Sequence, residues 1–390
     1  MLLYNTNYDI ASNLNTFFNQ INLPLSKPHY KMFPHILLGL ISSESVVTSD
    51  IAKNINHLNI QDESIQRKIR RLFNSKKFNP YELYHTIITY VIDNYKVKHS
   101  DNRVHITFDH MFCSDNFTVL SFNLRIGKQS IPLWFRCFKG KSDPYAFSSS
   151  LIIEGINYVH NLFKDKNYNL IFLADRFFPS CAILSHIASL NHTYVIRTRY
   201  EHKIRVFDSK EGHYVWKYIK DIKPHKYSSI IFNDVEYTYR HKILTNIVIG
   251  KENYSKDGIE EHWVIVTNGD PRRAIKDYAY RFGAIEFNFK NLKSNGFYLE
   301  TTKTKNLEAF TALYTFASIA ILWLTILGAD YAKNKHNISY NFIKINDVKK
   351  CKNVYKRVLS LFNTGLTLFH KCHNSPFNFK LKCNFILYDY

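Results

Sequence analysis

The segment NLIFLAD, residues 169–175, is the clearest indication of the fold in this sequence. It is a short apolar run that ends on Asp175, and such a run is typical of a central strand covered on both faces. A second segment, VHITFD at residues 104–109, alternates apolar with polar residues and ends on Asp109. Period-two alternation is the mark of a strand with one apolar face. Both segments therefore predict strands that carry a carboxylate at their end.

The surrounding segments predict a mixed α/β sheet. Two strand-like runs, residues 117–127 and 129–138, flank a tight Gly-Lys turn, so three antiparallel strands come first. Helical patterns at about 145–163 and at 181–190 precede NLIFLAD and the strand TYVIRTR, respectively. The order of three strands, helix, strand, helix and strand is that of a ribonuclease H-like core. In that order the first and fourth strands are neighbours, which would place Asp109 close to Asp175.

Length and composition indicate several packed units. The chain has 390 residues with 45% hydrophobic content, which suffices for a large core and excludes disorder as its dominant state. Short strand-like runs after residue 200 predict a β-rich insertion. The expected segments are a helical region at 1–100, the first part of the ribonuclease H-like core at 101–200, the β-rich insertion at 201–275, closing core helices at 276–335 and a helical tail at 336–390.

Charge and cysteine content indicate the class of binding partner and the cellular compartment. The chain has 52 Lys and Arg against 32 Asp and Glu, a net charge of +20, which favours a polyanion such as nucleic acid. Codon bias toward A and T also raises the lysine content, so the net charge alone does not establish a nucleic-acid partner. The six cysteines are scattered without a CxxC pair, and the first residues do not resemble a secretory signal. We therefore expect a cytoplasmic protein.

Two segments have an alternative interpretation. Residues 310–329 are twenty residues without a charge, about long enough to span a bilayer, but hydroxyl residues dilute the run and lysines flank both ends, so we expect a buried core helix and no membrane partner. The second segment holds possible zinc ligands, although their spacing matches no standard zinc finger. These are His370, Cys372, His373 and Cys383.

A helix-turn-helix outline lies in the N-terminal region. The segments SDIAKNI (49–55) and NIQDESIQRKIRRLF (59–73) form two short helical patterns joined by a polar stretch. Cations on the exposed face of the second helix would grip DNA phosphates. A solvated basic helix without a partner explains the same pattern equally well. The candidate DNA-binding residues are Arg67, Lys68, Arg70 and Arg71.

A helical pattern near residue 285 supplies a third carboxylate. Its apolar stripe consists of Phe282, Ile285, Phe289 and Leu292. Glu286, Lys290 and Lys293 share the opposite face, from which we expect Glu286 to face the two strand aspartates. Three converging carboxylates would hold divalent metal, because like charges otherwise raise one another's pKa values. Two Mg²⁺ or Mn²⁺ ions would activate a nucleophile and stabilise a leaving 3′-oxygen in phosphoryl transfer.

These motifs resemble the DDE transposases of bacterial insertion sequences, specifically the insertion sequence four group of cut-and-paste enzymes. FLADRFF is similar to the family's second-aspartate motif, with Phe177 where the family usually has Gly. Residues 278–297 are similar to the Tyr, Arg, Glu, Lys signature of that group. Six residues separate Glu286 from Lys293, as in the family, whereas four rather than three separate Arg281 from Glu286.

The resemblance implies a metal-dependent DNA transposase that binds double-stranded DNA as a homodimer. It also implies roles for seven residues. Asp109, Asp175 and Glu286 would be the catalytic residues and the metal ligands. Tyr278, Arg281 and Lys293 would bind DNA-end phosphates. Trp263, in HWVIVTNGDP, would stack on a flipped base, and a plain core tryptophan is an equally good explanation.

The main alternative is a catalytically decayed or domesticated DNA-binding protein derived from such a transposase. Phe177 and the longer gap before Glu286 are departures that decay would explain.

Overall fold

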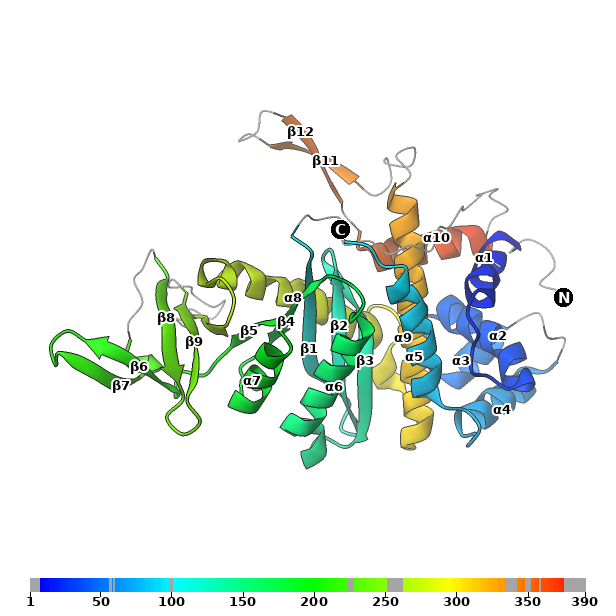
Figure 1. Ribbon diagram of the computed structural model, residues 1–390. Coiled ribbons are helices and arrows are strands. Elements are labelled where there is room, and N and C mark those ends of the chain that lie inside the picture. The colour runs from blue at the N-terminus through cyan, green and yellow to red at the C-terminus, as the bar shows by residue number, and fades with distance from the viewer. Residues whose placement is uncertain are drawn as a thin grey trace.

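The computed structural model describes residues 8–55, 58, 60–97, 101–222, 228–250, 262–333, 342–347, 352–357 and 359–374. Its centre is a ten-stranded mixed sheet with the strand order β3-β2-β1-β4-β5-β10-β9-β8-β6-β7. Helices cover the middle of the sheet and pack beyond β3, and the opposite end projects as a hairpin (Figure 1). The expected mixed α/β class is confirmed.

The first half of the sheet has the strand order β3-β2-β1-β4-β5. Strands β1, β2 and β3 pair antiparallel, and a two-residue turn at Gly127, with φ of 61°, joins β2 to β3. Strand β4 pairs parallel with β1, and β5 pairs parallel with β4. The five strands are β1 (Arg103–Cys113), β2 (Phe117–Ile126), β3 (Gln129–Lys139), β4 (Asn169–Ala174) and β5 (Thr193–Arg197).

Helices lie on both faces of this half-sheet. Gly155 of α6 lies directly against the ring of Phe122 on β2, and that ring stacks on Phe108 of β1 with 4.7 Å between centroids. Because side chains alternate along a strand, the next residue, Asp109, points to the other face, where it meets Arg281 of α8. The helices of this region are η1 (Pro144–Phe147), α6 (Ser149–Leu162), α7 (Cys181–Ser189) and α8 (Pro271–Lys293).

The expected β-rich segment is present, and it continues the same sheet. Strand β10 pairs antiparallel with β5, and β9, β8, β6 and β7 follow outward. The hairpin of β6 and β7 forms the far end of the molecule (Figure 1). The elements are β6 (Lys203–Asp208), β7 (His213–Tyr218), η2 (Ile219–Asp221), β8 (Ile230–Tyr237), β9 (Ile243–Ile249) and β10 (Val264–Thr267).

The N-terminal region is helical, as expected. Its short helix α3 packs against α4, and α4 turns a strictly apolar stripe inward. That stripe is Ile65, Ile69, Leu72 and Phe73. The bounds are α1 (Tyr8–Asn19), α2 (Lys27–Ser43), α3 (Thr48–Lys53), α4 (Asp62–Phe73) and α5 (Pro80–Asp93).

The long apolar segment is a core helix, which confirms the prediction. Helix α9 (Leu307–Lys333) is long and apolar enough to cross a membrane, and its apolar window is 100% buried inside the protein. It packs against α2, α4, α5, α10 and β3. Its Phe316 meets the rings of Phe33, Phe73 and Phe78. Helix α9 thus joins the N-terminal helices to the edge of the sheet.

The expected helical tail is corrected in its first part. Strands β11 (Phe342–Asp347) and β12 (Lys352–Arg357) form an antiparallel hairpin, and only then does α10 (Leu361–Asn374) follow. In FIKIND, Ile343 and Ile345 recur with period two, which is a strand signal. The 3-10 helix η3 (Leu299–Thr301) precedes α9. Residues 375–390 lie outside the described part of the chain.

Helices α9 and α10 cross at two glycines, and this close approach is testable. A Cβ at Gly328 would collide with the carbonyl oxygen of Leu361, and one at Gly365 with that of Leu324. Gly328→Ala should therefore lower the free energy of unfolding by about 1–3 kcal/mol in urea titrations. Gly283→Ala in α8 is the matched control, because its nearest neighbour would be the Lys128 oxygen at 3.5 Å.

The control should gain up to about 1 kcal/mol from helix propensity. Equal stability changes in the two variants would mean that α9 and α10 do not approach each other this closely.

Candidate active site

Asp109 and Asp175 lie at the same level of two neighbouring parallel strands. The register of β1 and β4 pairs Thr107 with Leu173, so two residues further along, Asp109 stands beside Asp175. The predicted neighbourhood of these strands is confirmed. Both aspartates keep part of their side chain accessible, 24% and 26% respectively. They form a two-carboxylate site at the centre of the sheet that solvent can reach.

A guanidinium joins the two carboxylates. Arg281 Nη2 lies 2.5 Å from Asp109 Oδ2 and 3.8 Å from Asp175 Oδ2, and the arginine side chain is only 6% exposed. The other carboxylate oxygens accept hydrogen bonds from the next backbone N–H, at 2.9 Å for His110 and 2.6 Å for Arg176. These backbone bonds fix both carboxylates with one oxygen turned toward the same cation.

The pKa of the Asp109 carboxyl is shifted toward neutral pH. Burial raises the pKa of its carboxyl to about 6, against the opposing effects of the Arg281 charge and the His110 N–H. The neighbouring charge of Asp175 also raises the pKa of Asp109. Because the Arg281 charge already lowers this pKa, any cation that replaces the guanidinium must compete with a proton for Asp109.

Helix α8 turns Glu286 away from the aspartates, which corrects the expectation that three carboxylates converge. The helix is unbroken from Pro271 to Lys293, and the face against the sheet carries Tyr278, Arg281 and Ile285, all buried. Glu286 follows Arg281 by five residues, about 140° around the helix, and is exposed. The buried face, rather than the charged one, meets the sheet, and an arginine stands where the sequence predicts a carboxylate.

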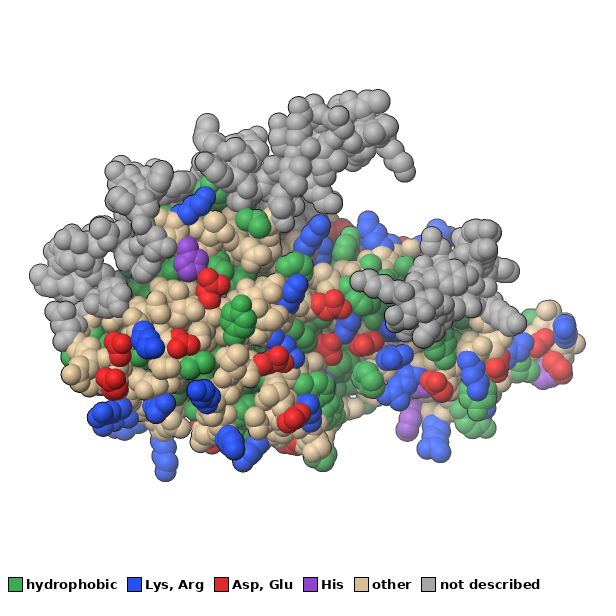
Figure 2. Space-filling view, turned by 180° about the vertical axis from the view of Figure 1, so that it is seen from behind, with side chains coloured by type: hydrophobic (Ala, Val, Ile, Leu, Met, Phe, Trp, Pro, Cys, Tyr) green, Lys and Arg blue, Asp and Glu red, His purple; other side chains and the backbone are tan. Residues whose placement is uncertain are grey.

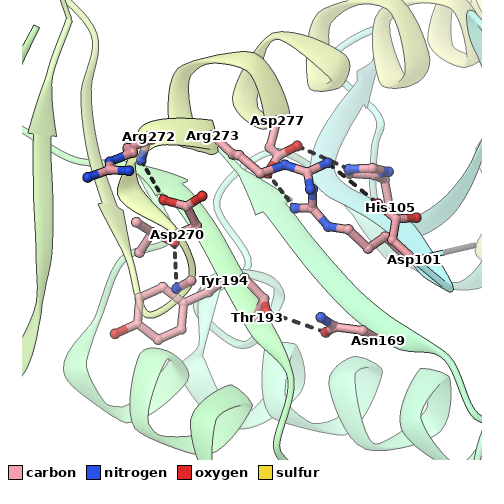
Figure 3. A network of polar contacts seen from close by, with 12 residues as sticks. Asp101, His105, Asn169, Thr193, Tyr194, Asp270, Arg272, Arg273 and Asp277 are labelled. Carbon is pink, nitrogen blue, oxygen red and sulfur yellow. Dashed lines mark hydrogen bonds and ion pairs between the residues drawn. The ribbon is translucent and has the colours of Figure 1, made fainter.

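A second ionic contact fixes this rotation of α8. Asp277, one turn before Arg281, accepts a hydrogen bond from Arg103 of β1 at 2.5 Å and lies 3.5 Å from His105 Nε2 (Figure 3). Burial opposes the charge on Asp277, but the contacts with His105 and Arg103 outweigh it and lower its pKa. Asp277 and Arg281 both hold α8 to β1, and sequence reasoning missed this pairing.

The three other residues assigned to DNA ends lie in different surroundings. Tyr278 is fully buried, and its ring lies edge-on to Trp263 at 5.2 Å. Trp263 is half-buried and stacks on Phe282 at 5.2 Å between centroids, which is the packing expected of a structural tryptophan. Lys293 pairs with Glu300, with 2.9 Å between Nζ and Oε1.

The basic side chains predicted to bind DNA are presented to solvent. All four lie on the outer face of α4, opposite its buried stripe. Figure 2 shows Lys and Arg spread over the face seen from behind. The exposed residues are Arg67, Lys68, Arg70 and Arg71.

The donor atoms at the candidate site do not fit two divalent ions as they are arranged. Among the described residues, no group of three or more His, Cys, Asp or Glu could hold a metal. Asp109 and Asp175 alone would fit one ion, at the place that the Arg281 guanidinium takes. Two of the possible zinc ligands can be placed against this prediction. His370 Nε2 pairs with Glu44 Oε1 at 2.9 Å, and Cys383 lies outside the described residues.

Comparisons with known proteins do not identify a family for this chain. No protein-family model matches the chain, and no curated protein matches it. Among solved structures, a similar chain is endonuclease V from Ciona intestinalis, in complex with a 23mer DNA containing an inosine followed by a ribo-adenosine. The match has a TM-score of 0.21 and 17% identity, and covers 66% of this chain and 97% of that chain. A TM-score this low does not establish a shared fold.

The bridging arginine gives a pH-dependent prediction. Arg281→Met removes the cation, so the pKa of Asp109 should rise further above about 6. A raised carboxyl pKa in the folded state costs stability as pH rises through that value. The variant should lose about 2 kcal/mol of unfolding free energy at pH 8, and clearly less at pH 5, where Asp109 is protonated in both proteins.

Denaturant titrations at the two pH values measure this difference. Arg272→Met, which changes an exposed arginine of the same helix, should show no such pH dependence. A pH-independent loss of stability in Arg281→Met would argue against the bridge.

Proposed function

We propose that this chain is a DNA transposase of the DDE type with a ribonuclease H-like core. One observation carries the proposal. Asp109 and Asp175 stand at the same level of neighbouring parallel strands, in a half-sheet of the order β3-β2-β1-β4-β5. The sequence resemblance to insertion-sequence transposases points the same way. Fold position alone does not assign an activity, so the proposal depends on the two carboxylates.

The proposed reaction is hydrolysis of a phosphodiester followed by transfer of the freed strand to another phosphodiester. Asp109 and Asp175 would present their free oxygens to one point, because their other oxygens are held by backbone N–H groups. A divalent cation bound there would supply Lewis acidity toward the scissile phosphate. With Arg281 in place, the same oxygens are already neutralised. Cation binding and the arginine bridge would therefore exclude each other.

The third carboxylate of the family pattern would come from Glu286. Its exposed position on α8 means that the helix would have to turn or shift on the sheet as Arg281 leaves the aspartates. DNA is a suitable trigger, because its phosphates would compete with Asp109 and Asp175 for the arginine. In this proposal the observed arrangement is the resting one.

A second candidate function is DNA binding without cleavage. The observation that favours it is the buried guanidinium between the two carboxylates, together with Ile285 at the sheet-facing position one turn after Arg281. A chain that had lost its third carboxylate could retain the arginine as a permanent partner of the aspartates. The basic face of α4 would still bind DNA.

Cleavage assays separate the two functions. Duplex DNA that carries terminal inverted repeats, if such repeats flank the gene, should be nicked by the wild-type chain with Mg²⁺ or Mn²⁺. Asp109→Asn, Asp175→Asn and Glu286→Gln should each abolish nicking and keep the gel shift, because only metal coordination is lost. Asp165→Asn, which alters an exposed aspartate, is the control and should nick normally.

A wild-type chain that shifts the DNA but nicks it with neither metal would favour the second function. Nicking by Glu286→Gln alone would remove Glu286 from the site and leave the two aspartates.

The helix-turn-helix assignment predicts a salt dependence. Binding of the full chain to duplex DNA should weaken steeply with salt, and Arg70→Ala with Arg71→Ala should flatten the log–log slope by about 0.9 for each phosphate that is no longer neutralised. Fluorescence anisotropy at several salt concentrations gives the slope. Lys164→Ala, at an exposed lysine just after α6, should leave the slope unchanged. An unchanged slope in the double variant would make α4 a solvated basic helix.

A further inference from the structure

The β6–β7 hairpin carries its large aromatic side chains on one open face. The register pairs Lys203 with Tyr218, Arg205 with Trp216 and Phe207 with Tyr214. Directly opposed residues of an antiparallel pair point to the same side. These six residues therefore form one surface, which we call the hairpin face. It consists of Lys203, Arg205, Phe207, Tyr214, Trp216 and Tyr218.

These rings are not needed for the core of the hairpin. Phe207 and Tyr214 are 58% and 59% exposed, whereas Ile204 and Val206, on the opposite face of β6, are 0% and 7% exposed. Burial on that opposite face already anchors the hairpin. Contiguous aromatic side chains left in water mark a binding surface.

Cations lie beside the rings. Lys203 Nζ is 4.4 Å and Lys220 Nζ is 5.0 Å from the centre of the Tyr218 ring. The guanidinium carbon of Arg205 is 5.7 Å from the Tyr214 ring, and Arg205 also pairs with Glu236 at 3.3 Å. The face thus alternates flat rings with positive charge.

The β8–β9 turn extends the same surface. Tyr239 is 63% exposed, and its ring lies edge-on to Trp216 at 5.3 Å. Arg240 and Lys242 of this turn are exposed as well. The surface stands at the end of the projecting hairpin, away from the sheet centre that holds the two aspartates (Figure 1).

We propose that the hairpin face binds single-stranded nucleic acid. Unpaired bases would stack on Phe207 and Tyr214, and Lys203 and Lys220 would hold the phosphates, the combination used by single-strand binding surfaces. A protein interface would favour aromatic residues but is depleted in lysine, whereas lysines flank Tyr218 here. Base-paired DNA would hide the faces of its bases from these rings. The site does not depend on metal chemistry.

The test uses the full chain and a fluorescein-labelled oligothymidylate of about 20 nucleotides, with EDTA present to prevent cleavage. Anisotropy titrations should show binding by the wild type. The double variant Phe207→Leu with Tyr214→Leu keeps the apolar character but removes the rings, and should bind at least about tenfold more weakly. Phe287→Leu, at a 36%-exposed ring on α8, should bind like the wild type.

Two results would overturn the proposal. One is equal binding of the oligothymidylate by the double variant and the wild type. The other is a wild-type dimer in light scattering that the double variant converts to monomer, which would make the face a protein interface. Circular dichroism melting of each variant confirms that it is folded. The titration contains EDTA and measures binding alone. Its result therefore does not depend on whether the chain nicks DNA in the separate cleavage assay.

Discussion

The contact between Arg281 of α8 and the two aspartates of the sheet determines how the centre of this protein is built. Two carboxylates side by side on neighbouring strands repel each other and are costly to bury, and the guanidinium offsets both effects. The same contact sets the rotation of α8, together with the pairing of Asp277 with Arg103 one turn earlier. These two ionic contacts place Arg281 inward and leave Glu286 outward on α8.

The two aspartates and the two possible nucleic-acid surfaces lie on different elements. The aspartates belong to β1 and β4 in the covered part of the sheet. The basic face of α4 lies among the N-terminal helices, which α9 joins to β3. The hairpin face lies at the other end, beyond β8.

The sequence predicts the central strands well because their signals are local. Alternation in VHITFD, the apolar run NLIFLAD and the Gly127 turn each depend on neighbouring residues, and β1, β2, β3 and β4 follow them. The pairing of β10 with β5 joins residues about seventy positions apart, which no local pattern reveals. Hence the sequence predicts an insertion where the structure has a continuation of the sheet.

The phase of α8 is harder to predict. Phe282, Phe287 and Phe289 put aromatic rings on several sides of the helix, so the apolar stripe is ambiguous. The true inner face includes Asp277, Arg281 and Asn288, polar residues that a pattern assigns to solvent. Their partners on β1 and β2 are distant in sequence, for example Asn123, which accepts a hydrogen bond from Asn288 at 3.0 Å. The pattern consequently places Glu286 inside, where the structure has Arg281.

In the proposed function, Asp109 and Asp175 form a cation site that Arg281 fills in the resting protein. Anomalous scattering of Mn²⁺ in crystals of the full chain with the DNA that it binds would locate such a cation. We expect a manganese peak between the two aspartates, with the Arg281 guanidinium withdrawn from both. A bound DNA with Arg281 still bridging the aspartates and no manganese peak between them would contradict it.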